Sequence, residues 1–144
     1  MSTVKFSFSG ESQGISRFVG KARDFQITID QPPVSESIES NNPCPVEYTL
    51  ASLGGCVNIV AHHIAQELNI NLKSLKIKVD GNLNPNRFVN GDSSERAGFT
   101  DIDVQLDVES DASPELLDKW LTIVKDRCPV SDNLANQTKL AIAV

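Results

Sequence analysis

The sequence predicts an α+β fold, with a mainly antiparallel sheet wrapped around one long central helix. Residues 45–68 carry a continuous apolar stripe at helical spacing, and residues 113–127 carry a second, shorter one. Segments with strictly alternating apolar residues come in runs between these helices. Runs of strands separated by helices favour α+β over the regular βαβ alternation of parallel sheets.

The totals indicate one globular domain spanning residues 1–144, and they exclude several function classes. The net charge is −6 and no block of lysine or arginine is present, which disfavours a nucleic-acid partner. No window holds 18 consecutive apolar residues, so no membrane span is predicted. The first ten residues lack the apolar core of a signal peptide, so we expect a cytoplasmic protein. In that compartment the three cysteines are expected to be thiols.

Five segments have the alternation or composition of strands. Residues 3–9 alternate strictly, and residues 15–30 predict two short strands that turn near Gly20 and Lys21. Residues 72–84 and 99–111 predict two longer strands, the second with the cleanest alternation. Residues 138–144 predict a final strand.

The remaining segments predict helices and connections. Residues 31–45 contain four prolines and form a loop, and residues 85–98 form a polar connection. The helix over residues 113–127 has Ser113 as its cap and Pro114 at its first position. Residues 128–137 predict a further short helix.

The central helix is predicted to be buried on most sides. Its main stripe consists of Val46, Leu50, Leu53, Val57, Val60, Ile64 and Leu68, and a second stripe of Ala51, Cys56, Ile59 and Ala61. Gly54 and Gly55 in its middle each weaken a helix by about 1 kcal/mol relative to alanine. Either another backbone or a partner subunit passes close to this turn, or tight helix packing alone explains the pair.

Cys56 follows the two glycines directly. An unpaired cysteine is most often a small buried hydrophobe. Ser52 and His63 lie on the same helical face as Cys56, and small residues there leave the space that a reactive thiol needs.

The other two cysteines are predicted to precede helices. Cys128 lies before Pro129, and Cys44 lies before Pro45. A helix N-terminus lowers the pKa of a thiol, and Arg127 is expected to add to that effect at Cys128. Spacing alone does not rank the three thiols.

Two cysteine segments carry a resemblance to a known family. "NPCPVEYTLASLGGC", residues 42–56, resembles the N-P-x-P-x-E-x-x-L-x-x-x-x-x-C signature of the OsmC/Ohr superfamily. "GFTDIDVQLDVESDASPELL" followed by "RCPVSDNL" is similar to the segment around the second cysteine of that superfamily. The resemblance implies an OsmC-like, intertwined homodimer with its sites at the subunit interface.

The resemblance also implies a thiol-dependent peroxidase that acts on organic hydroperoxides or hydrogen peroxide in the oxidative stress response. By this analogy Cys56 is the peroxidatic thiolate and Cys128 the resolving partner. Oxidation gives a sulfenic acid at Cys56, which condenses with a thiol to a disulfide. A thiol or lipoyl-type dithiol reductant then restores the pair. No other cofactor is implied.

The activating residues depart from the Ohr pattern. Ohr enzymes pair their reactive cysteine with an arginine and with a glutamate ten positions upstream. Here that position is Val46, and Glu47 is nine residues from Cys56, on the opposite helical face. Glu47 either activates Cys56 or only complements the helix dipole. Arg17 and Arg23 lie where the family places its arginine, and Arg23 is the better candidate.

Two alternative functions compete with the peroxidase. Cys44, Cys56, Cys128, His62 and His63 could supply metal ligands, but no C-x-x-C or H-x-x-x-H spacing is present, so no metal site is predicted. The second alternative is an OsmC-like dimer that binds a small apolar molecule and has little peroxidase activity.

Overall fold

A computed structural model describes residues 2–31 and 41–144 of the chain. The chain forms two compact units, Met1–Thr49 and Leu50–Val144. The predicted proline-rich loop, residues 31–45, lies mostly outside the described residues.

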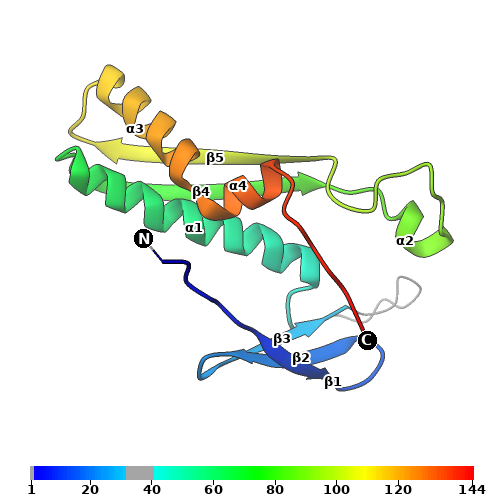
Figure 1. The fold of residues 1–144 in the computed structure, drawn as a ribbon. Helices are drawn as coiled ribbons and strands as arrows, with labels where there is room; N and C mark the ends of the chain where they lie inside the picture. Colours follow the sequence, from blue (N-terminus) through cyan, green and yellow to red (C-terminus); the bar gives the residue numbers. More distant parts are fainter. Residues whose placement is uncertain (1, 32–40) are drawn as a thin grey trace. The chain divides into compact units, whose positions relative to one another are not determined.

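The first unit contains a three-stranded antiparallel sheet (Figure 1). Its strands are β1 (Ser9–Ser12), β2 (Arg17–Ala22) and β3 (Phe25–Asp30), paired in that order. The two predicted short strands are therefore present, but the chain turns at Arg23, which has a left-handed φ of 56°. Gly20 lies within β2, where a side chain would clash with the Phe8 ring and the Ser9 carbonyl. Gly20 therefore lets Phe8 and the Ser9 backbone approach β2 closely, and it does not form the turn.

The helix α1 spans Pro45–Glu67, as the apolar stripe predicts. At its start the Cys44 backbone N–H donates a 2.8 Å hydrogen bond to Glu47 Oε2, and the Tyr48 N–H donates to the Cys44 carbonyl. A glutamate at the third helical position that reaches back in this way is half of a capping box.

The second unit contains a long β-hairpin, β4 (Leu72–Asn82) and β5 (Asp101–Ser110), which are antiparallel. Leu75 lies opposite Val108, and Ile77 lies opposite Leu106, so the apolar residues share one face. The predicted polar connection between these strands contains a short helix, α2 (Asn86–Asn90), that its polar sequence did not indicate.

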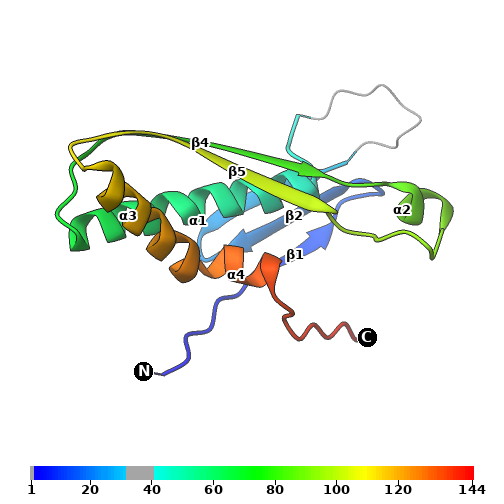
Figure 2. The same cartoon turned by 90° about the horizontal axis from the view of Figure 1, so that it is seen from above.

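Two further helices complete this unit, α3 (Pro114–Arg127) and α4 (Pro129–Ala135), both as predicted. The Ser113 hydroxyl caps α3 by accepting from the Leu116 N–H. The apolar face of the hairpin packs against α1 and α3 (Figure 2). The buried core consists of Leu53, Val57, Ala61, Ile64, Ala65, Ile70, Trp120, Val124 and Cys128.

In this chain α1 is buried on one face. The second predicted stripe is mostly uncovered, because Ala51 is exposed and Ile59 is 70% exposed. The hairpin and α3 cover only the side of the helix that carries Leu53, Val57 and Ile64. The prediction of burial on most sides is therefore wrong for a single chain.

The predicted terminal strands are also wrong for the single chain. Within the described residues, neither 2–8 nor 137–144 joins a β-ladder. Phe6 and Ile142 are each 90% exposed, whereas Phe8, directly before β1, is partly covered by Phe18. Alternation fits a strand, but a strand also needs a neighbouring backbone to satisfy its N–H and C=O groups.

None of the helices in the described part of the chain has the length and apolar character needed to cross a membrane.

Candidate active site

Cys56 lies in the middle of α1 and is half-buried. Its helical neighbours Leu53 and Val57 are buried in the core of the second unit. A side chain at Gly54 would make only an ordinary 3.5 Å contact with Val79, and one at Gly55 would meet nothing within 4 Å. Packing within the described chain therefore requires neither glycine.

Cys128 forms the junction between α3 and α4. It ends α3 and precedes Pro129, the first residue of α4, and its side chain is only 1% exposed. The expected N-cap position is thus confirmed, and the backbone N–H groups of Val130 and Ser131 interact with the sulfur.

The two sulfur-bearing side chains meet in the core of the second unit. The Cys56 side chain interacts with that of Cys128, although the two residues are 72 positions apart in the sequence. Burial, together with this contact to Cys56, raises the pKa of the Cys128 thiol. The N–H groups of α4 act in the opposite direction but do not outweigh burial. The expectation of a lowered pKa at Cys128 is therefore wrong, and Cys128 keeps its proton at neutral pH.

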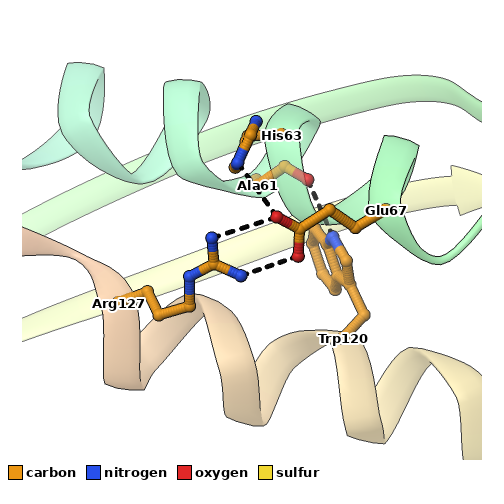
Figure 3. Close-up of polar contacts among 5 residues, drawn as sticks. All are labelled: Ala61, His63, Glu67, Trp120 and Arg127. Atoms are coloured by element: carbon orange, nitrogen blue, oxygen red, sulfur yellow. Dashed lines mark hydrogen bonds and ion pairs between the residues drawn. The ribbon is translucent and has the colours of Figure 1, made fainter.

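Arg127 does not supply the expected activating charge to Cys128. Its guanidinium makes two hydrogen bonds to the Glu67 carboxylate, of 2.6 Å and 3.0 Å (Figure 3). His63 Nε2 contacts the same carboxylate at 3.0 Å. The bond from Arg127 lowers the pKa of Glu67 and raises that of Arg127, so both groups stay charged and their charges are matched.

An apolar cavity of about 530 Å³ opens beside Cys128. It lies among α1, α3, α4 and β5. Its lining is mostly aliphatic and includes Leu53, Val57, Val104, Leu106, Leu117, Trp120, Leu121 and Val124, with Asp118, Lys125 and Ser131 as polar members. A cavity of this size and character suits a small apolar molecule.

A second cavity, of about 470 Å³, shares Leu53, Val104 and Ser131 with the first. It is more polar, and Arg96 lines it together with Asp101. Arg96 is exposed, and nothing in its local sequence distinguishes it from other surface arginines; the lining of this second cavity includes neither Cys56 nor Cys128.

The predicted activating residues belong to the first unit. Glu47 is engaged at the start of α1, where the bond from the Cys44 N–H lowers its pKa. Arg23 lies at the β2–β3 turn, with its guanidinium 4.9 Å from the centre of the Phe25 ring, a cation–π distance. Arg17 begins β2 opposite Asp30. Their action on Cys56 stays a prediction.

The histidines are surface residues of α1. His62 and His63 are both exposed, and His63 is engaged with Glu67. Across residues 2–31 and 41–144, no group of three or more histidine, cysteine, aspartate or glutamate side chains lies close enough together to hold a metal ion.

The structure is similar to several solved structures. An OsmC-like protein from Mycoplasma pneumoniae has a TM-score of 0.79 and 20% sequence identity, over 93% of this chain and 89% of that chain. An OsmC-like protein of unknown function from Vibrio cholerae has a TM-score of 0.72 and 15% identity, over 90% and 93%. An organic hydroperoxide resistance protein OsmC from Legionella pneumophila has a TM-score of 0.64 and 14% identity, over 93% and 91%. At these identities the likeness shows the fold alone.

No curated protein matches the sequence. The profile of the OsmC-like protein family, however, matches residues 38–143, which include all three cysteines and most of the chain. The chain therefore belongs to the OsmC-like protein family.

Proposed function

We propose that the protein is a cytoplasmic thiol-dependent peroxidase that reduces organic hydroperoxides or hydrogen peroxide through Cys56 and Cys128. The observation that carries this proposal is the contact between these two side chains, which come from distant parts of the sequence. Membership of the OsmC-like family supports it, as does the structural likeness to proteins that confer organic hydroperoxide resistance.

The proposed reaction has two steps on the protein. The Cys56 thiolate attacks a peroxide oxygen, the O–O bond breaks, and the alkoxide leaves and takes up a proton as the alcohol. Sulfur is oxidised by two electrons, giving a sulfenic acid, while the peroxide is reduced. The Cys128 sulfur then attacks the sulfenic sulfur, the S–S bond forms, and the hydroxyl group leaves as water. A dithiol reductant opens the disulfide by thiol–disulfide exchange and restores both thiols.

The pKa directions support this division of roles. Cys128 is buried, and its raised pKa keeps it protonated, so it suits the later resolving step. We propose that Glu47 and either Arg23 or Arg17 complete the activation of Cys56.

The second candidate function is binding of a small apolar molecule with little peroxidase activity. The cavity of about 530 Å³ favours it, because its lining is mostly aliphatic. Under the peroxidase proposal, the same cavity accommodates the organic part of a bulky hydroperoxide.

Turnover separates the two candidates. Reduced protein is mixed with cumene hydroperoxide and an excess of dihydrolipoamide, and the hydroperoxide remaining is assayed over time. The peroxidase is expected to consume many equivalents of hydroperoxide per chain. Consumption no faster than in a protein-free control, together with saturable binding of an apolar probe in the cavity, would favour the binding protein.

We further propose that the functional form is an intertwined homodimer. In one chain the α1 face that carries Ile59 and Gly55 is uncovered, and the alternating segments at both ends lack strand partners within the described residues. A second chain that covers this face and pairs with these segments would satisfy both. Sedimentation velocity is expected to give twice the mass of one chain. A single-chain mass at micromolar concentration would contradict the dimer.

A further inference from the structure

Helices α1 and α3 are joined by two polar contacts (Figure 3). Trp120 Nε1–H donates a 2.9 Å hydrogen bond to the Ala61 carbonyl, within the buried core. Arg127 binds the Glu67 carboxylate with both terminal nitrogens. These partners are seven residues apart on α3 and six residues apart on α1.

The geometry of the ion pair follows from the directions of the helices. Helices α1 and α3 run in roughly opposite directions (Figures 1 and 3). Helical side chains tilt toward the N-terminus of their own helix, so Glu67 and Arg127 point toward each other. A bidentate guanidinium–carboxylate contact also restricts orientation more than a single hydrogen bond does. The Trp120 hydrogen bond and this ion pair together therefore restrict the position of the last turn of α3.

This last turn leads directly into the resolving thiol. Arg127 is the final residue of α3, and Cys128 follows it as the first residue outside the helix. Oxidation of Cys56 to a sulfenic acid replaces the sulfur–sulfur contact with a bulkier group. Disulfide formation then requires the sulfurs to approach to about 2.05 Å, with a restricted dihedral angle. The backbone before Cys128 must hold its place while this happens.

We propose that Glu67 and Arg127 are positioning residues that hold Cys128 within reach of oxidised Cys56. This inference rests on the proposed peroxidase function. The ion pair is expected to act on the resolving step alone, because Glu67 and Arg127 bind each other and neither is among the groups that shift the pKa of Cys128. His63, the third member of the cluster, supports the Glu67 carboxylate from within α1.

Two variants break the ion pair in different electrostatic ways. Glu67→Gln removes the carboxylate and leaves the Arg127 cation unmatched beside Cys128, whereas Arg127→Gln removes the cation. If the pair acts by position, both variants slow disulfide formation by about two- to fivefold, the range expected for a partly exposed ion pair. Both leave the rate of sulfenic acid formation at Cys56 unchanged. Arg127→Lys keeps the positive charge but cannot make the two-bond guanidinium contact. It is expected to restore part of the rate of disulfide formation.

The two rates are measured by rapid quench after addition of cumene hydroperoxide. Sulfenic acid is trapped with dimedone, free thiols are alkylated, and both products are quantified by mass spectrometry. Lys76→Gln is the control, because it breaks another exposed ion pair, Lys76–Asp107, on the hairpin. Melting curves by circular dichroism show whether any variant has lost its fold.

Each outcome has a distinct meaning. Equal disulfide rates in wild type and both ion-pair variants would overturn the positioning role. Opposite effects of Glu67→Gln and Arg127→Gln would also overturn it, because they would show that the charge beside Cys128 matters instead. If the wild type itself forms no Cys56–Cys128 disulfide, the proposed function fails rather than this inference.

Discussion

Replacing Cys56 with serine is expected to abolish peroxide turnover, with a loss of at least about a thousandfold in rate. Serine is nearly isosteric, but its hydroxyl is not ionised at neutral pH and does not enter the sulfenic acid cycle. Removing a catalytic nucleophile elsewhere has had effects of this order or larger. Hydroperoxide consumption with an excess of dithiol measures the loss.

Cys44→Ser is the matched control for this variant. Cys44 precedes α1, where its backbone N–H binds Glu47, and serine keeps that N–H. Cys44 takes no part in the interaction between Cys56 and Cys128. The Cys44→Ser variant is therefore expected to keep most of the peroxidase activity. A dead Cys44→Ser variant beside an active Cys56→Ser variant would reverse the assignment and make the thiol before α1 the nucleophile.

Replacing Trp120 with alanine is expected to cost about 3–5 kcal/mol in the free energy of unfolding. The side chain is only 2% exposed, and it packs between α1 and the hairpin and donates to the Ala61 carbonyl. Removing a large buried aromatic side chain loses its transfer free energy and leaves a cavity. Urea unfolding, followed by circular dichroism at constant protein concentration, measures the change.

Two control variants separate the contributions of packing and hydrogen bonding to this loss of stability. Trp120→Phe keeps most of the apolar ring and loses the hydrogen bond, so about 1–2 kcal/mol is expected. Phe88→Ala removes an aromatic ring that is 75% exposed on α2, and a change within about 0.5 kcal/mol is expected. If Trp120→Ala cost no more than Phe88→Ala, Trp120 would not anchor α3 to α1.

Much of the fold follows from local patterns. The stripe from Leu53 to Ile64 predicts α1, and Ser113 with Pro114 predicts the start of α3. The alternation in residues 72–84 and 99–111 predicts the hairpin. In each case the apolar residues lie on a face that one chain covers by itself. Where the pattern needs a partner backbone, as at Phe6 and Ile142, the strand prediction is wrong for the single chain.

The candidate site is less predictable from local pattern. The N-cap position of Cys128 is visible in its sequence, but the burial that raises its pKa depends on packing against α1. Arg127 looked like a source of charge for that thiol because it is adjacent in sequence. Its true partner, Glu67, is 60 residues away, and no local spacing indicates that pairing. Alternating apolar residues and helix caps reflect local structure. Which charged side chains pair between two helices depends instead on how the helices cross.

The most direct test of the central claim maps the disulfide that forms on oxidation. Reduced protein receives one equivalent of cumene hydroperoxide without reductant, remaining thiols are alkylated, and peptides are analysed by mass spectrometry. No lysine or arginine separates Cys44 from Cys56, so trypsin leaves both on one peptide. A glutamate-specific protease that cleaves after Glu47 separates them.

The peroxidase account expects rapid loss of two thiols per chain, with Cys56 linked to Cys128 and Cys44 alkylated. Three alkylated thiols at millimolar peroxide, or a linkage that includes Cys44, would contradict it.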